Sequence, residues 1–307
     1  MPTPSLSVVI CTHDPRPAYL ERVLAALRAQ TLPRERWELV VVDNASAEPL
    51  AGRWDLAWHA GARHVREGEL GLTPARLRGI REAAGELVVF IDDDNVAAED
   101  YLAEAERVAA TRADIGAFGG SIAGEFEAPP PAWIGPYLAG LGVSLLERDY
   151  WSNLPGWSLA TPYGAGMCVR RSVARDYLEK VAASTRRRGL DRVGRTLTSG
   201  GDTDLAWCAL DLGLGTGRFH RMRLTHLIPA ARLTEEYVAR LFAGFAAANE
   251  ILAQVRAREP VPARVPWTDT ARFAWRYARA RGIEKEILLA TRRALREARE
   301  RLREEAA

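Results

Sequence analysis

The sequence of 307 residues contains few cysteines and almost no lysine. Its three cysteines, Cys11, Cys168 and Cys208, are widely spaced and form no Cys-x-x-Cys pair. This excludes a disulfide-rich scaffold and a zinc-finger type of site, and it indicates a reducing compartment. Positive charge comes from arginine, because Lys180 and Lys285 are the only lysines, and the formal net charge is only +2. Such a balance gives no reason to expect a nucleic acid or an acidic polymer as a partner.

Long hydrophobic runs are also missing. The run from Leu6 to Cys11 is too short to cross a membrane, and Met1-Pro2-Thr3-Pro4 lacks the basic residues of a signal peptide. No other run approaches the length of a membrane-spanning helix. We therefore expect a cytoplasmic protein that is either soluble or held at the inner face of the cell membrane.

The first part of the chain alternates two kinds of pattern. Short apolar runs rich in β-branched residues extend over Leu6–Cys11, Leu39–Val42 and Leu87–Ile91, as is typical of strands buried on both faces of a parallel sheet. Amphipathic stretches at Ala18–Gln30 and Thr73–Ala84 lie between them. This order predicts an α/β fold with a mostly parallel, doubly wound sheet flanked by helices. Ligands bind such sheets at the carboxyl ends of the strands.

Polar residues follow each of the three apolar runs. They are Thr12-His13-Asp14, Asp43-Asn44 and Asp92-Asp93-Asp94-Asn95. Any one of these groups could be an ordinary turn or helix cap. Three groups at one edge of a sheet are different, because their carboxylates repel one another unless a cation or a ligand compensates. Asp92 and Asp94 have the spacing and the position to face Mg²⁺ or Mn²⁺ together with substrate phosphates.

Three further groups could take part in chemistry. Arg76 lies in a helical stretch that begins after Gly71, and it could hold phosphate oxygens or simply belong to a solvated basic helix. Asp202 and Asp204 follow two glycines at the start of a predicted helix, where Asp is a good cap and where Asp202 could also act as a general base. His226 follows a predicted strand and is either a packed residue or a metal ligand.

The second half has a looser pattern beyond about Gly120. A proline-rich loop precedes Trp133, Trp151 and Trp157, each of which could be a core or loop anchor, and one of which we expect to line a ligand site. The remaining elements that we predict are a helix from Asp202 to about Leu212, a strand Phe219–Leu224, a helix Thr234–Gln254, a linker through Pro260, Pro262 and Pro266, and helices Thr268–Arg281 and Glu284–Glu304.

In its motifs the sequence resembles the inverting family 2 glycosyltransferases of the GT-A fold, from Ser5 to about Leu241. The matching pieces occur in the order of the family: Ser7–Asp14, Val41–Ser46, Gly71–Gly79, Phe90–Asp94, Gly164–Met167, Gly201–Leu205 and His226–Pro229, followed by Arg232–Thr234 and Tyr237. Three positions depart from the family pattern, which usually has an acidic residue where Gly201 stands, Asn where Leu77 stands and an aromatic residue where His13 stands. The missing acid removes an acceptor contact but leaves Asp202 in place.

The resemblance implies transfer of a sugar from a nucleotide diphosphate-sugar, most commonly of UDP, to a hydroxyl of a glycan or lipid-linked glycan. It implies a Mn²⁺ or Mg²⁺ cofactor and a role for each matching residue. These roles are donor binding for Thr12, His13, Asp14, Asp43, Arg76, Asp92 and Asp93, metal binding for Asp94 and His226, proton abstraction for Asp202, and acceptor contacts for Gly166, Met167 and Asp204. Because aromatic rings suit the apolar faces of sugars, Trp133 of the three tryptophans is assigned to the acceptor side as well.

We expect one glycosyltransferase domain over residues 1–241, with a nucleotide-binding half at 1–120 and an acceptor-side half at 121–241. A helical C-terminal extension at 242–307 would follow it. The basic and aromatic stretch 268–281 either lies on an anionic membrane surface or packs on the catalytic domain. The last helix carries an apolar stripe of Ile287, Leu288, Leu295 and Leu302, which could form a homodimer contact.

Two other functions fit parts of the sequence. A phosphohydrolase of the haloacid dehalogenase type would use Asp92 as nucleophile, Lys180 as its lysine and Asp202 as a late metal ligand. Its motif normally follows the first strand, whereas two strand–helix units precede Asp92 here. A non-catalytic nucleotide-sugar-binding protein could keep Asp43 and Asp94, but it would have no need of Asp202.

Overall fold

The computed structural model describes residues 4–192, 194, 196–257 and 267–304. These residues form a nine-stranded sheet in the order β3-β2-β1-β4-β8-β6-β9-β5, with β7 paired to β9. The strands are β1 (Leu6–Thr12), β2 (Trp37–Asn44), β3 (Ala62–Glu67), β4 (Leu87–Phe90), β5 (Asn95–Ala97), β6 (Ile115–Phe126), β7 (Tyr150–Ser152), β8 (Cys168–Arg170) and β9 (Gly215–Ile228).

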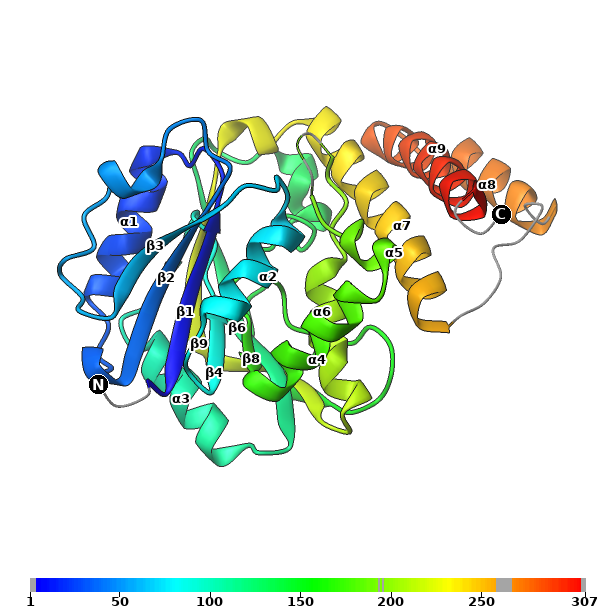
Figure 1. Cartoon of the computed structure of the whole chain (residues 1–307). Helices are drawn as coiled ribbons and strands as arrows, with labels where there is room; N and C mark the ends of the chain where they lie inside the picture. The colour runs from blue at the N-terminus through cyan, green and yellow to red at the C-terminus, as the bar shows by residue number, and fades with distance from the viewer. Residues whose placement is uncertain (1–3, 193, 195, 258–266, 305–307) are drawn as a thin grey trace.

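Helices cover both faces of the sheet (Figure 1). Apolar side chains of α1 and α3 pack on one face, and those of α2, α4 and α6 pack on the other. The helices are α1 (Pro17–Arg28), α2 (Leu72–Glu82), α3 (Tyr101–Thr111), α4 (Arg171–Ala182), α5 (Thr185–Arg188), α6 (Gly201–Asp211), α7 (Glu235–Ala257), α8 (Trp267–Arg279) and α9 (Ile283–Glu304), with 3₁₀ turns that include η3 (Ala132–Tyr137) and η4 (Ala230–Arg232).

The first half of the chain folds as the pattern predicts. Strands β1, β2 and β4 pair in parallel and are almost entirely buried, which explains their continuous apolar sequences. Helix α1 begins at Pro17, a residue well suited to the first helical position. The sequence patterns missed β3, whose basic sequence Ala62–Glu67 pairs in parallel with β2. Asp92 therefore follows the fourth strand of the chain and not the third.

The second half is more regular than its sequence suggests. β6 and β9 are long parallel partners, and β8, β5 and β7 are antiparallel to their neighbours. Glycines interrupt the strand pattern of β6. They allow the backbones of β6 and β9 to approach each other closely. A Cβ at Gly120 would lie 1.8 Å from the carbonyl oxygen of Met222, at an irregularity in the β6–β9 register.

Both expected boundaries fall inside secondary structure. The boundary at 120/121 lies within β6, and the boundary at 241/242 lies within the continuous helix α7. The expected linker prolines, Pro260, Pro262 and Pro266, lie outside the described residues.

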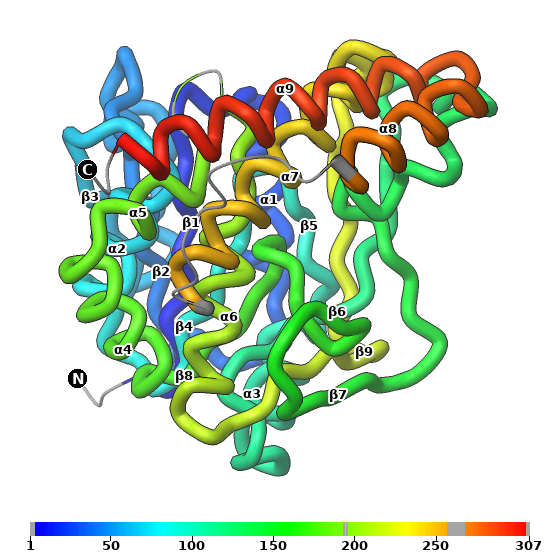
Figure 2. The backbone as a smooth tube through the Cα atoms, turned by 90° about the vertical axis from the view of Figure 1, so that its right-hand side faces the viewer, coloured from blue at the N-terminus to red at the C-terminus, as the bar shows by residue number. Residues whose placement is uncertain are grey.

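The C-terminal helices lie at one end of the molecule (Figures 1 and 2). α9 packs along α7 and buries Leu288 and Leu302, whereas Ile287 and Leu295 of the same stripe are partly exposed, so the homodimer contact stays a prediction. α8 packs on α9, where Arg292 lies 4.2 Å from the ring centroid of Phe273. The ring of Phe273 contacts Arg292 of α9 and Tyr277 of its own helix. Over the described residues, no helix combines the length and apolar character required to span a bilayer.

Candidate active site

Strand pairing brings the acidic run to a histidine. Asp94 immediately precedes β5, and the antiparallel pairing of β5 with β9 places Asn95 opposite His226. The main-chain oxygen of Asp94 accepts a hydrogen bond from Leu227 N at 2.8 Å. As a result, Asp94 Oδ2 and His226 Nε2 are 3.3 Å apart, and both side chains are nearly buried. The sequence predicted that His226 follows its strand, but β9 continues to Ile228 and His226 lies within it.

Arg232 adds a cation to this pair. Its Nη1 lies 3.1 Å from Asp94 Oδ2 and 3.0 Å from His226 Nε2, so one guanidinium faces two converging acceptor atoms. Two ligands held at right angles about 2.1 Å from one ion would be about 3 Å apart, close to the separation of these two acceptors. A carboxylate and an imidazole also suit Mn²⁺ chemically, and a carboxylate alone suits Mg²⁺. The residues therefore fit a divalent cation, provided that the Arg232 side chain turns away.

The three carboxylates of the acidic run have different proton affinities. Burial alone would raise the pKa of Asp94, but His226 and the Arg232 guanidinium lower it to about 2. Burial and the Asp94 charge raise the pKa of Asp93 to about 7, although a hydrogen bond from the Thr12 hydroxyl opposes this. Burial and Asp94 likewise raise the pKa of Asp92, against the charges of Arg76 and His226.

The turns that follow β1 and β2 interlock. Asp14 and Ala45 both adopt positive φ angles, of 45° and 54°. Ala47 N donates to Asp14 Oδ1 at 2.9 Å, and Ser46 N donates to Asp43 Oδ1 at 3.0 Å. Ala rarely adopts such a φ because its Cβ crowds the backbone, so the hydrogen bonds of the two aspartates hold a strained connection.

The carboxylate of Asp43 forms its hydrogen bonds with other groups of the protein. Its carboxylate is buried and also accepts hydrogen bonds from Leu50 N and Arg66. Burial raises its pKa, but these hydrogen bonds outweigh that effect and hold the pKa below its ordinary value. The donor contact expected for Asp43 stays a prediction.

A pocket of about 170 Å³ joins the acidic run to the first turn. It brings together four residues with expected donor or metal roles and five residues to which the sequence patterns assigned no role. The lining residues are His13, Asp14, Asp93, Asp94, Arg16, Tyr19, Arg232, Pro15 and Pro229.

Asp202 lies in the first turn of α6, where a carboxylate is favoured by the helix dipole. Its Oδ2 accepts a hydrogen bond from Gly164 N at 3.1 Å. A side chain at position 164 would collide with the neighbouring groups, because a Cβ there would lie 2.9 Å from Arg76 Nη2 and 3.1 Å from Asp202 Oδ2. Arg76 is itself buried. Helix α2 therefore places Arg76 near the candidate base. The alternative that Arg76 belongs to a solvated basic helix is wrong.

Asp191 is the main site residue that the sequence patterns missed. It lies in the loop before α6, and its buried Oδ2 is 2.9 Å from Arg76 Nη1. A single Asp in an irregular loop matches no motif, so nothing in the sequence indicated that Asp191 would contact Arg76. Arg232 was visible only as part of the closing segment after His226.

Three of the residues that were expected to contact the acceptor are closely packed by the protein. Met167 is completely buried in the core, so its side chain cannot contact an acceptor. A Cβ at Gly166, which has φ +71°, would lie 2.4 Å from Leu224 and from the hydroxyl of Tyr101. Trp133 is partly buried in the cluster between η3 and α7, with its ring centroid 6.2 Å from that of Tyr137.

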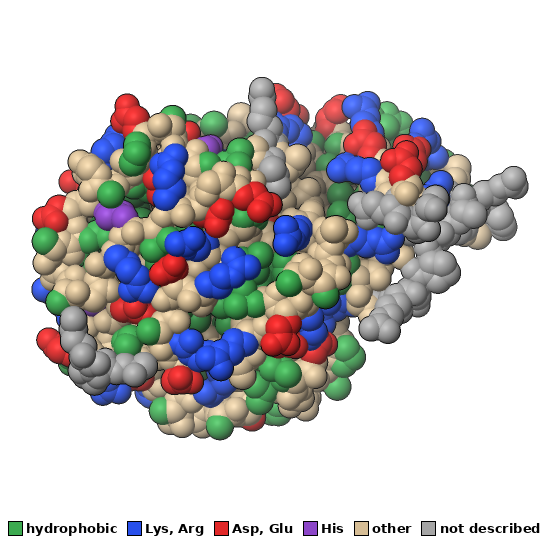
Figure 3. Space-filling model, viewed as in Figure 1, with side chains coloured by type: hydrophobic (Ala, Val, Ile, Leu, Met, Phe, Trp, Pro, Cys, Tyr) green, Lys and Arg blue, Asp and Glu red, His purple; other side chains and the backbone are tan. Residues whose placement is uncertain are grey.

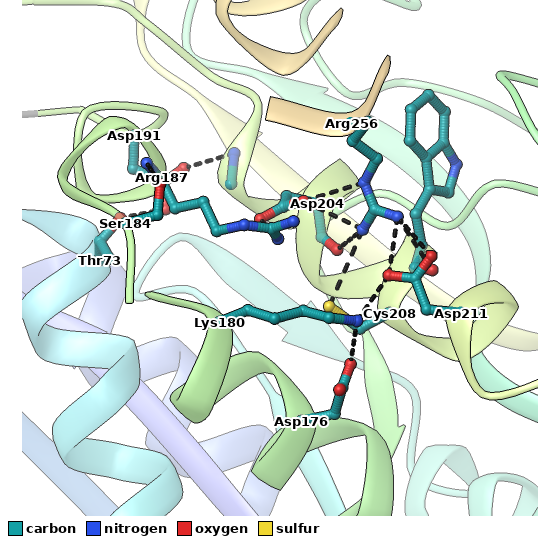
Figure 4. A network of polar contacts seen from close by, with 12 residues as sticks. Thr73, Asp176, Lys180, Ser184, Arg187, Asp191, Asp204, Cys208, Asp211 and Arg256 are labelled. Carbon is teal, nitrogen blue, oxygen red and sulfur yellow. Dashed lines mark hydrogen bonds and ion pairs between the residues drawn. The ribbon is translucent and has the colours of Figure 1, made fainter. Parts of the chain in front are cut away.

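Asp204 belongs to a network of polar contacts with Arg187 and Arg256, as Figure 4 shows. It is fully buried between Arg187 and Arg256, at 2.5 Å and 3.0 Å. Lys180 belongs to the same network and pairs with Asp176 and Asp211. The role of Asp204 as an acceptor contact and that of Lys180 as a catalytic lysine are therefore both contradicted by the structure.

A second hollow, of about 220 Å³, lies between α2 and α4 on the face shown in Figure 3. Arginines Arg81, Arg171 and Arg175 surround an apolar floor, and basic side chains are visible around hydrophobic ones there. It shares no residue with the acidic pocket, so the chemistry described above does not involve it.

Comparison with known proteins gives a consistent result. The model of the family described as "Glycosyl transferase family 2" matches residues 7–178. A protein of Bacillus subtilis (strain 168) that carries the glycosyltransferase name EpsH is 28% identical over 117 residues, which are 38% of this chain and 33% of that protein. Glycosyltransferase AglE of Haloferax volcanii is 28% identical over 94 residues, which are 30% of this chain and 31% of AglE. The matches thus span about a third of each relative.

Solved structures resemble the chain over a greater length. Residues 1–349 of S. aureus TarS in complex with UDP superpose with a TM-score of 0.52 at 14% identity, over 96% of this chain and 91% of that one. GalNAc-T7 with UDP, GalNAc and Mn²⁺ gives a TM-score of 0.51 at 17% identity, over 82% of this chain and 52% of that one. At these identities the likeness concerns the fold.

Proposed function

The chain belongs to glycosyl transferase family 2 and has the GT-A fold, and from this premise we propose that it is a metal-dependent inverting enzyme. It would transfer a sugar from a nucleotide diphosphate-sugar, with UDP as the nucleotide, to a hydroxyl of a glycan or lipid-linked glycan. One observation carries the proposal. Gly164 N donates a hydrogen bond to Asp202 Oδ2 at 3.1 Å, and Met167 O, three residues later, accepts one at 2.8 Å from Phe90 N, two residues before Asp92. The segment 164–167 therefore links the candidate base to the strand end that carries the acidic run, which supports a single site.

The residues divide the reaction between them. Asp202 takes the proton from the acceptor hydroxyl as its oxygen attacks the anomeric carbon, and the configuration inverts because one displacement occurs. Arg76 and Arg232 supply positive charge on the side where the diphosphate departs. Asp94 and His226 would hold Mn²⁺ or Mg²⁺, which when bound supplies further charge for the leaving diphosphate. The pocket of about 170 Å³ is smaller than typical ligand sites of about 300 Å³ or more, so Arg232 has to move when the donor binds.

Substitution of the base tests this mechanism. Asp202→Asn should lower turnover by about 10²- to 10⁴-fold, the usual contribution of general base catalysis, while UDP affinity measured by calorimetry stays within about threefold of wild type. Asp114→Asn is a matched control, because Asp114 is an exposed carboxylate paired with Arg112. Substantial turnover by Asp202→Asn would show that the base has been assigned to the wrong residue.

Among the three expected tryptophans, Trp157 is the best placed for an acceptor sugar. Trp157 is 58% exposed, and its ring packs edge-on against Tyr163 with centroids 6.4 Å apart. Tyr163 directly precedes Gly164, the partner of Asp202. Exposed aromatic rings suit the apolar faces of sugars, and this supports an acceptor platform at Trp157 in place of Trp133.

We also propose peripheral membrane contact through α8. Arg272, Trp275, Arg276 and Arg279 lie on its exposed surface, and each Arg near an anionic bilayer contributes about 1 kcal/mol. The chain should therefore sediment with phosphatidylglycerol vesicles but not with phosphatidylcholine vesicles. Arg272→Glu/Arg276→Glu should weaken this binding by at least about tenfold. Equal binding of both proteins would refute the contact.

A further inference from the structure

Asp191 holds together two segments that are distant in sequence. Its Oδ2 accepts hydrogen bonds from Thr73 Oγ1 at 3.0 Å and from Arg76 Nη1 at 2.9 Å, both on α2. Its Oδ1 accepts a hydrogen bond from Gly201 N at 3.2 Å, in the first turn of α6. Figure 4 shows Thr73 and Asp191 side by side. The carboxylate is only 3% exposed, so water does not compete for these contacts.

The fit around Gly201 shows that this contact is built into the fold. A Cβ at position 201 would lie 2.2 Å from Asp191 Oδ2 and 2.4 Å from its Cγ. Any side chain there would displace the carboxylate. Gly201 thus leaves the space that Asp191 fills, and the next residue of the helix is Asp202.

The charges near Arg76 explain what the contact does. Arg76 is a buried cation, and Asp191, Asp202 and Asp92 all act on it. Asp191 pairs with Nη1, whereas Nη2 and Asp202 Oδ2 both lie close to Gly164, at 2.9 Å and 3.1 Å from where a Cβ at that position would be. A buried cation that loses its partner seeks another anion. Without the Asp191 carboxylate, Arg76 would turn toward Asp202 and occupy the oxygen that has to accept a proton.

We infer that Asp191 is a positioning residue that keeps Arg76 on the donor side and the first turn of α6 in place, so that Asp202 remains free to act as the base. This inference rests on the proposed function. Asp191 touches neither donor nor acceptor in this arrangement and acts through Arg76 and Gly201.

A double-mutant cycle tests the inference. The variants are Asp191→Asn, Arg76→Gln and the double variant, with UDP release from UDP-glucose and UDP-N-acetylglucosamine measured in the presence of Mn²⁺. Asp191→Asn should lower kcat by about 10- to 100-fold, as small misplacements of catalytic groups do. In the Arg76→Gln background the same substitution should change kcat by less than about threefold, because the cation that it releases is gone. If Asp191→Asn acted only by loosening the structure, kcat would fall by the same factor in both backgrounds.

Thr73→Val is the matched control. It removes one hydrogen bond from the same carboxylate but leaves the charge, so kcat should fall by no more than about threefold. A loss as large as that of Asp191→Asn would show that loop packing, and not the charge on Arg76, is what matters.

Thermal unfolding provides an arm that does not depend on turnover. Asp191→Asn should lower the Tm of the chain that carries Arg76 and should have little effect on the Tm of Arg76→Gln. Equal decreases in the two backgrounds would overturn the inference. If wild type releases no UDP from either donor while the Tm values show the expected coupling, it is the proposed function that fails and not the pairing of Asp191 with Arg76.

Discussion

Substitution of Asp204 by Asn gives the sharpest test of how the base-bearing helix is held. Asp204 lies two residues after Asp202 on α6, and its side chain is completely buried. Its Oδ2 is 2.5 Å from Arg187 Nη1, and its Oδ1 is 3.0 Å from Arg256 Nη2. It therefore connects α6 to α5 and to α7, as Figure 4 shows.

The expected cost follows from the burial of all three charges. The side chains of Arg187 and Arg256 are only 10% and 17% exposed, so Asp204→Asn leaves Arg187 without its anion and leaves Arg256 with the partly exposed Asp211 alone. Breaking a buried ion pair in this way costs about 3 to 5 kcal/mol of unfolding free energy. For a chain of this size about 2 °C of Tm corresponds to each kcal/mol, which predicts a decrease of about 6 to 10 °C.

Asp211→Asn provides the comparison within the same network. Asp211 also pairs with Arg256, at 2.9 Å, but its side chain is 36% exposed. Exposed ion pairs contribute only about 0 to 1 kcal/mol, so the Tm should fall by no more than about 2 °C. The assay is thermal unfolding followed by circular dichroism at neutral pH. Equal decreases for the two variants would refute the argument that burial sets the cost.

Two further predictions concern the metal site and the acid limit of stability. Asp94→Asn should weaken the Mn²⁺-dependent part of UDP binding by at least about tenfold, as seen in calorimetric titrations with and without a chelator, since one of the two proposed metal ligands loses its charge; an unchanged Mn²⁺ effect would contradict that ligand assignment. Burial raises the pKa of Glu38, but hydrogen bonds from Ser7, Arg63 and Ala84 N outweigh it and hold the pKa below its ordinary value. Glu38 thus contributes stability that is present above its unfolded pKa and is lost as the pH falls through the folded one. The Tm of wild type should decrease between about pH 5 and 3 more steeply than that of Glu38→Gln, and parallel pH profiles would contradict this.

The sequence predicted best those strands whose burial requires a continuous apolar pattern. The buried strands β1, β2 and β4 need apolar residues at nearly every position, so their patterns are continuous and were recognised. β3 is an edge strand whose residues are mostly partly exposed, and its sequence does not distinguish it from a loop. β6 contains glycines at its close approach to β9, which weakens the strand pattern.

The residues of the candidate site likewise divide into those that the sequence indicated and those that it did not. Asp94 and Asp202 stand in motifs at the ends of predicted elements, and so they could be found from sequence alone. The contacts of Asp191 and Arg232 depend on how distant segments pack, since Asp191 meets Arg76 across 115 residues. Asp204 was misjudged because its position two residues after Asp202 suggested a shared site. On a helix, residues two apart point in different directions, and Asp204 faces the protein interior instead.

The binding of a nucleotide together with a metal tests the central proposal most directly. Thermal unfolding should be followed with UDP, dTDP and GDP, each with and without Mn²⁺. We predict that UDP with Mn²⁺ raises the Tm and that neither of them alone does so to the same extent, because ligand at about 100 times its Kd adds about 2.7 kcal/mol to the stability of the folded state. A Tm that does not change with any nucleoside diphosphate, in the presence or absence of Mn²⁺, would contradict the proposed function.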